Sequence, residues 1–148
     1  MITNSLIALF KEDLGILKRE IESYRVEKNL WKVSEGISNS AGNLCLHLIG
    51  NLNTYIGVVF GKTSYIRQRD LEFSLKNVPR VTLLQQLEEV SMVVERALNC
   101  LADSQFEVPY PLAEQEKPTN NGYMLIHLVS HLNYHLGQIN YHRRVFDV

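Results

Sequence analysis

The sequence predicts an all-α protein, a four-helix bundle formed by a single domain over residues 1–148. Four stretches repeat apolar residues at spacings of three and four, which places them on one face of an α-helix. No stretch shows the alternation of apolar and polar residues that is typical of a half-buried strand. The length of 148 residues is sufficient for one sizeable hydrophobic core.

The first helix is expected to run from Thr3 or Asn4 to Arg25. Its expected buried face consists of Leu6, Leu9, Phe10, Leu14, Leu17, Ile21 and Tyr24. The connection that follows, residues 26–38, carries the only tryptophan, Trp31, which we interpret as an anchored aromatic side chain.

The second helix is expected to begin near Ser38 or Ser40, because either hydroxyl suits an N-cap, and to run to about Phe60. Gly61 is a suitable stop signal. Residues 61–80 show no clean period and predict a long connection to the third helix. Structureless connections of this length are uncommon in compact domains and are often functional.

The third helix is expected to start at Thr82, where Gln85 completes a capping box, and to reach about Asp103. Three prolines within residues 106–118 predict a loop. Residues 119–121 offer caps for the fourth helix, which contains four of the five histidines.

Composition and charge argue against several classes of function. The formal net charge of −1, without a block of like charges, disfavours nucleic-acid binding through a broad basic surface. No apolar run approaches the roughly 20 residues that a membrane span needs, and the N-terminus reads as an amphipathic helix rather than a signal peptide. Cys45 and Cys100 fit no metal or redox motif, so we expect free thiols and a cytoplasmic location.

The histidines of the last helix have the spacing of metal ligands. His127, His131 and His135 follow one another at four residues, which lines them along one edge of a helix. The outer two lie about 12 Å apart along the axis, so we do not expect all three to bind one ion. Either His127 with His131 or His131 with His135 would pair. Each pair needs a further ligand from another helix, and His47 is the only histidine elsewhere.

His47 is expected at the border of the apolar face of the second helix. Asn43, Asn51 and Tyr55 lie four or eight residues from it and are therefore candidates to support a metal ligand from behind.

The sequence also resembles a known family. The pattern His131-x-x-x-His135-x-Gly137-Gln138-Ile139 resembles the last helix of the DinB-like superfamily. The stretch 39–52, which contains His47, resembles the second helix of one uncharacterised subgroup. The similarity continues through Ile56-Gly57, Tyr65-x-Arg67-x-Arg69 and Glu72-Phe73, and covers nearly the whole chain.

The resemblance implies a four-helix bundle that binds one divalent metal through His47, His131 and His135, with His127 outside the ligand set. It implies a homodimer, because many members are dimers. Some relatives are thiol S-transferases that use low-molecular-weight thiols such as bacillithiol or mycothiol, and others are maleylpyruvate isomerases or hydrolases. The resemblance does not identify a substrate for this subgroup.

Three imidazoles without a thiolate leave coordination positions open, which is typical of catalytic rather than structural sites. Zinc or nickel is the favoured ion, with iron or copper as alternatives. We therefore expect a metal-dependent enzyme of the thiol S-transferase or hydrolase kind that acts on a small molecule. The alternative is a non-enzymatic metal- or ligand-binding dimer.

The sequence offers few residues for the chemistry itself. His127 and Glu72 are the available candidates for a catalytic base, and His127 and His142 are otherwise ordinary helix-face histidines. Arg67 and Arg69 are either solvated loop charges or a clamp on a substrate carboxylate. Helix geometry leaves the ligand pair open, because an antiparallel second and fourth helix would favour the later pair and a parallel arrangement the earlier one. The motif selects His131 and His135.

Overall fold

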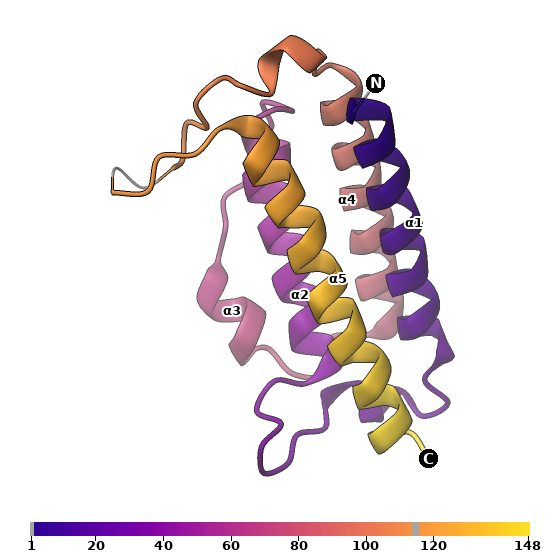
Figure 1. The fold of residues 1–148 in the computed structure, drawn as a ribbon. Coiled ribbons are helices and arrows are strands. Elements are labelled where there is room, and N and C mark those ends of the chain that lie inside the picture. The colour runs from indigo at the N-terminus through magenta and orange to yellow at the C-terminus, as the bar shows by residue number, and fades with distance from the viewer. Residues whose placement is uncertain (1, 114–115) are drawn as a thin grey trace.

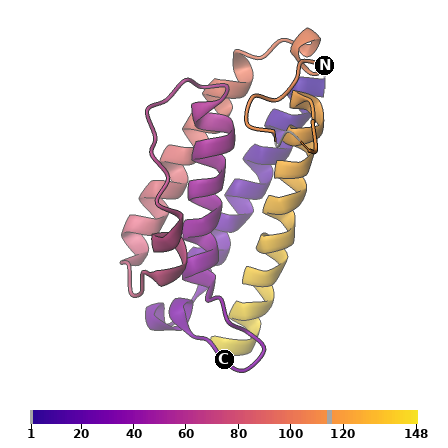
Figure 2. The same cartoon turned by 90° about the vertical axis from the view of Figure 1, so that its left-hand side faces the viewer.

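The structure, a computed structural model, describes residues 2–113 and 116–148. Four long helices lie side by side (Figure 1): α1 (Ile2–Ser23), α2 (Ala41–Leu52), α4 (Arg80–Asn99) and α5 (Asn121–Phe146). A short helix, α3 (Arg69–Ser74), packs outside them against α2 (Figure 2). The residues described contain no β-strand beyond isolated bridges, so the all-α prediction is confirmed. They contain five α-helices where the sequence predicted four.

The direction of the helices answers a question that the sequence left open. In Figure 1, α1 and α5 run down the page, whereas α2 and α4 run up it. Because α2 and α4 point the same way, the chain between them returns along the outside of the molecule and carries α3 on the way. The second and last long helices, α2 and α5, are therefore antiparallel neighbours.

Helix α2 is the most enclosed element, since every one of its residues is buried. Of the two serines considered as its cap, Ser40 has this role, because its Oγ accepts a hydrogen bond of 3.2 Å from the backbone N–H of Asn43. A π-helical stretch, Asn53–Val58, extends α2 towards its predicted end. At its start, Gly42 lies against the ring of the buried Trp31, where a Cβ would approach three ring atoms to 2.7 Å. Trp31 is thus anchored, as expected.

The predicted start of the third long helix is wrong. Helix α4 begins at Arg80, after Pro79, and the capping box at Thr82 does not form. The backbone N–H of Arg80 instead donates to the Glu27 carboxylate at 2.5 Å, so a side chain from another segment satisfies the first turn. Gln85 bonds to Glu89 on the same helix. The helix ends at Asn99 rather than near 103.

Helix α3 occupies part of the stretch that we expected to be without structure. Six residues are too few to show a helical period, which explains why the sequence did not reveal it. Asn43 on α2 fastens this helix, because its Nδ2 donates to the backbone carbonyls of Glu72 (2.9 Å) and Leu75 (2.8 Å).

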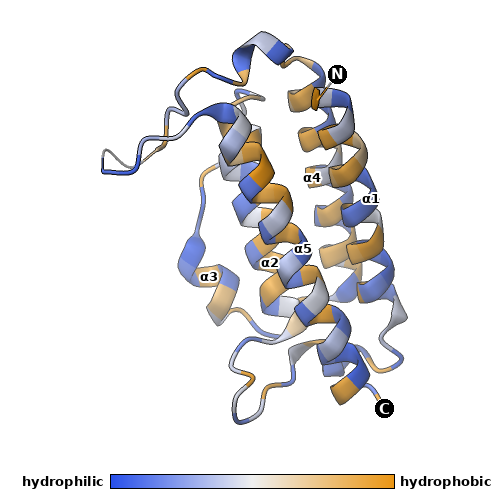
Figure 3. Cartoon of the chain, viewed as in Figure 1, coloured by the Kyte–Doolittle hydropathy of each residue, from blue (hydrophilic) through white to orange (hydrophobic). Residues whose placement is uncertain are grey.

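The long helices bury their apolar residues in one shared core. Figure 3 shows hydrophobic residues in orange along these helices. Leu9 is the exception on α1, since it is 45% exposed although we expected it in the buried face. The expected cap of the last helix is Asn120, whose side chain accepts a 2.8 Å hydrogen bond from the backbone N–H of Tyr123. The predicted loop 106–118 contains no helix where it is described, and its residues 114–115 lie outside the described part. No described helix is both long and apolar enough to span a bilayer.

Candidate metal centre

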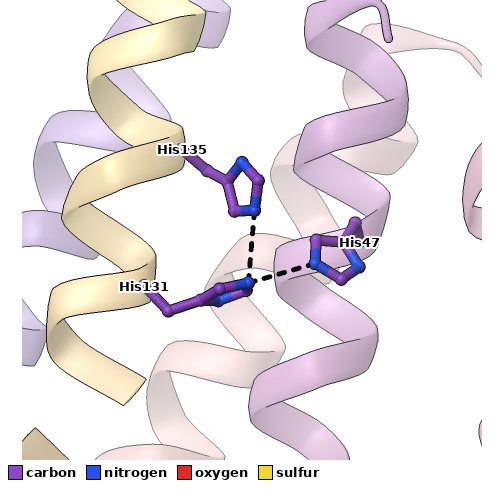
Figure 4. A group of neighbouring side chains, drawn as sticks. All are labelled: His47, His131 and His135. Atoms are coloured by element: carbon purple, nitrogen blue, oxygen red, sulfur yellow. Dashed lines mark hydrogen bonds between the residues drawn. The ribbon is translucent and has the colours of Figure 1, made fainter. Parts of the chain in front are cut away.

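Three histidine rings from two helices converge on one point (Figure 4). Nε2 of His131 lies 3.3 Å from Nε2 of His47 and 3.2 Å from Nε2 of His135. A ligating nitrogen from each of the three rings lies within 4.8 Å of the other two. His47 comes from α2, and the other two lie one turn apart on α5.

The antiparallel packing of α2 and α5 explains which pair meets His47. His47 lies in the second turn of α2, and because the two helices are antiparallel, the start of α2 lies opposite the middle and later part of α5 rather than its first turns. Its partners are consequently His131 and His135, one turn beyond the earlier pair. His127 does not join the group.

The geometry of the three nitrogens fits a single transition-metal ion. Bonds of about 2.0–2.1 Å to a tetrahedral ion separate two ligand nitrogens by about 3.4 Å. The two distances at His131 come close to this value. Burial, together with the neighbouring His135 and His47 rings, lowers the pKa of His131 to about 4. Its ring is therefore neutral near pH 7, as metal ligation requires.

The opposite nitrogens of two rings have hydrogen-bond partners. Nδ1 of His47 lies 3.1 Å from Oε1 of Glu72, and Nδ1 of His135 lies 2.7 Å from Oε1 of Gln138. Each oxygen accepts a hydrogen bond from a protonated Nδ1, which leaves Nε2 with a free lone pair that faces the common point. Nδ1 of His131 is buried without a partner in the described residues.

Glu72 is buried and held on two sides. Besides His47, its carboxylate accepts two hydrogen bonds of 2.9 Å from Arg67, one from Nε and one from Nη2. The same contact raises the pKa of the Arg67 guanidinium. The guanidinium of Arg67 also lies over the Tyr55 ring, with its carbon 5.7 Å from the ring centre. The structure thus pairs Glu72 with Arg67, although we considered the first as a base and the second as a substrate clamp.

The other predicted site residues, Asn43, Asn51 and Arg69, differ in what they contact. The side chain of Asn43 donates to the backbone carbonyl of Glu72. It therefore holds α3 in place rather than a histidine ring. Asn51 is buried, and its Oδ1 has no hydrogen-bond partner among the described residues. Arg69 is exposed, and its guanidinium carbon lies over the Phe73 ring at 6.0 Å.

The two remaining histidines lie apart from the common point. The exposed His127 stacks on the Tyr123 ring at 6.4 Å, and its own ring centre is 6.4 Å from that of His131. His142 is buried at the end of α5, where its ring nitrogens bond to the Tyr24 hydroxyl (2.7 Å) and to the carbonyl of Lys32 (2.8 Å). His142 therefore ties α5 to the first connection, and burial lowers its pKa.

Sequence reasoning did not anticipate the bond between Glu72 and His47. The two residues are 25 positions apart, and no period links them. The Phe73 ring, whose centre is 5.0 Å from that of His47, was missed for the same reason. The only signal was that both residues lie in stretches that resemble one family.

An all-helical fold with a three-histidine group between two antiparallel helices defines a class of candidate metal-binding proteins. The family model of the DinB superfamily matches residues 21–139. The chain therefore belongs to the DinB superfamily. No curated protein matches it.

Proposed function

We propose that this protein is a four-helix DinB-type metal protein that binds one divalent transition-metal ion through Nε2 of His47, His131 and His135. The convergence of these three nitrogens, with His131 at 3.2–3.3 Å from each of the other two and all three within 4.8 Å of one another, is the observation that carries the proposal. The donor set contains only imidazoles, which favours zinc or nickel over the hard cations calcium and magnesium.

We further propose that the site is catalytic and acts on a small molecule. A divalent ion held by three imidazoles supplies a Lewis acid with open positions, which lowers the pKa of a bound water or thiol. A hollow of about 460 Å³ is lined in part by His135, and a second of about 590 Å³ is lined in part by His127 and Tyr55. These volumes suit a small ligand. His127, at the rim, is available for proton transfer.

The reaction is tested with untagged protein whose metal content is first determined by elemental analysis. Metal-loaded protein is then incubated with a panel of low-molecular-weight thiols and electrophiles, and separately with ester and amide substrates. We expect turnover in one panel that disappears in His131→Ala and on chelation. Turnover with thiols assigns thiol transfer, and turnover without them assigns hydrolysis. Absence of His131-dependent turnover in both panels contradicts the enzyme.

The arrangement of Glu72 favours a second candidate, a non-enzymatic metal- or ligand-binding module. The Glu72 carboxylate is buried and paired with Arg67 and His47, so it is not free to accept a substrate proton. Tight binding of a ligand that is recovered chemically unchanged after long incubation would support this function over catalysis.

We also propose a homodimer formed along the outer face of α5. Tyr123, Tyr134 and Tyr141 are 64%, 66% and 66% exposed, and their spacings of 11 and 7 residues equal about three and two helical turns. They therefore share one face, and exposed aromatic side chains are enriched at interfaces. Light scattering should give twice the chain mass of 17.0 kDa.

A matched pair of variants tests where the dimer forms. Tyr134→Glu should shift the mass to that of the monomer, because it places a charge within the proposed interface. Met92→Glu, which changes an exposed apolar residue of α4, should leave the dimer intact. A monomeric wild type at micromolar concentration would refute this proposal.

A further inference from the structure

We infer that Glu72 is a positioning residue for the metal centre, and that α3 exists in this fold to deliver it to the rear of His47. In this role Glu72 fixes the proton of His47 on Nδ1, so that Nε2 keeps its lone pair directed at His131 and His135. The inference rests on the proposed metal-binding function and concerns a residue outside the ligand set.

The hydrogen-bond geometry assigns the proton. The Glu72 carboxylate is ion-paired with Arg67 and only accepts hydrogen bonds, so its 3.1 Å contact with Nδ1 of His47 requires a proton on that nitrogen. Nη2 of Arg67 also approaches Nδ1, but at 3.4 Å, and it lies closer to Oε1 of Glu72, at 2.9 Å. Glu72 therefore accepts the hydrogen bond of Arg67 Nη2 that would otherwise be directed at Nδ1 of His47.

Without Glu72 the same neighbours would favour the wrong tautomer. Arg67 has only donors, and its nearest remaining acceptor would be Nδ1 of His47. A ring that accepts at Nδ1 carries its proton on Nε2, where it blocks the metal. Glu72 thus orients the His47 ring by accepting its Nδ1 hydrogen bond, and it also neutralises the charge of Arg67.

Several contacts of α2 and α3 fix the position of Glu72. Asn43 holds the backbone carbonyl of Glu72 on α3, and the Phe73 ring lies 5.0 Å from the His47 ring. On α2, Gly50 leaves the space that the carboxylate fills, because a Cβ at that position would overlap Oε2 of Glu72. Residues of both α2 and α3 therefore hold the Glu72 carboxylate against the His47 imidazole.

The experiment compares Glu72→Gln with Glu20→Gln in the full-length protein. Glu20 also forms an ion pair with an arginine, since Arg143 Nε donates to it at 2.7 Å, but the pair joins α1 to α5 away from the three rings. Zinc affinity is measured by competition with a chelator. We expect Glu72→Gln to weaken zinc binding about 10- to 100-fold, as loss of such a partner typically does, and Glu20→Gln to leave it unchanged.

A second readout needs no metal. Long-range nitrogen–proton spectra of the imidazoles in metal-free protein should show His47 protonated on Nδ1 in the wild type and shifted towards Nε2 in Glu72→Gln. Adding Arg67→Met to Glu72→Gln should partly restore both the tautomer and the zinc affinity, because the competing donor is gone. A merely structural role for Glu72 predicts no such rescue, since the double variant would lose stability further.

The outcomes separate this inference from the function on which it rests. Zinc binding by the wild type that Glu72→Gln does not weaken overturns the inference and leaves the metal site standing. Absence of zinc binding by the wild type overturns the metal site itself, and the imidazole spectra then decide the tautomer alone. A wild-type His47 that carries its proton on Nε2 overturns the inference in either case.

Discussion

Alanine in place of His131 is expected to reduce the bound metal from one ion per chain to nearly none. His131 is the central ligand of the proposed site, because its Nε2 lies within 3.3 Å of the Nε2 atoms of both His47 and His135. Its removal leaves two imidazoles on different helices. We expect the affinity to fall by more than the roughly 10- to 100-fold that loss of an outer partner costs. Elemental analysis of untagged protein and chelator competition measure the effect.

His127→Ala is the matched control for this experiment. His127 lies one turn earlier on the same helix, is exposed, and stacks on Tyr123 rather than joining the three nitrogens. Its substitution should leave the metal content unchanged, whereas His135→Ala should lower it. Loss of metal from His127→Ala with retention in His135→Ala would reverse the assignment of the ligand pair.

Gly50→Ala should weaken zinc binding about 10- to 100-fold through its effect on Glu72. Alanine is favoured over glycine inside a helix by about 1 kcal/mol, so propensity alone predicts a more stable protein. The added methyl group would, however, overlap Oε2 of Glu72, and the carboxylate cannot move without breaking the bond of Oε2 to Arg67 and that of Oε1 to His47. The steric effect therefore acts on the metal ligand, and it opposes the gain from propensity.

Gly137→Ala on α5 separates the two effects. It is the same substitution within a helix two residues from His135, but no atom of the described residues lies within 4 Å of the Cβ it would add. We expect a gain in stability of about 0.5–1 kcal/mol by urea denaturation and an unchanged zinc affinity. Equal zinc affinities for the two glycine variants would show that the carboxylate does not need its space beside Gly50.

The long amphipathic helices could be predicted because their local sequence repeats a pattern over several turns. Local sequence also predicted the serine cap of α2, the asparagine cap of α5 and the anchored Trp31. A cap or an aromatic anchor depends on only a few neighbouring residues. The start of α4 was misjudged because its first N–H is satisfied by Glu27, which is remote in sequence. Helix α3 was missed because six residues show no period.

By itself, the sequence determined the all-helical class, the family and the three histidines that are candidate metal ligands. These features depend on local periodicity and on motifs carried within single helices. Only the tertiary structure decided that α2 and α5 run antiparallel, that His47 therefore faces His131 and His135, and that Glu72 lies behind it. The physical reason is that helix direction and the path of residues 59–79 are set by packing between distant segments, on which a local pattern carries no information.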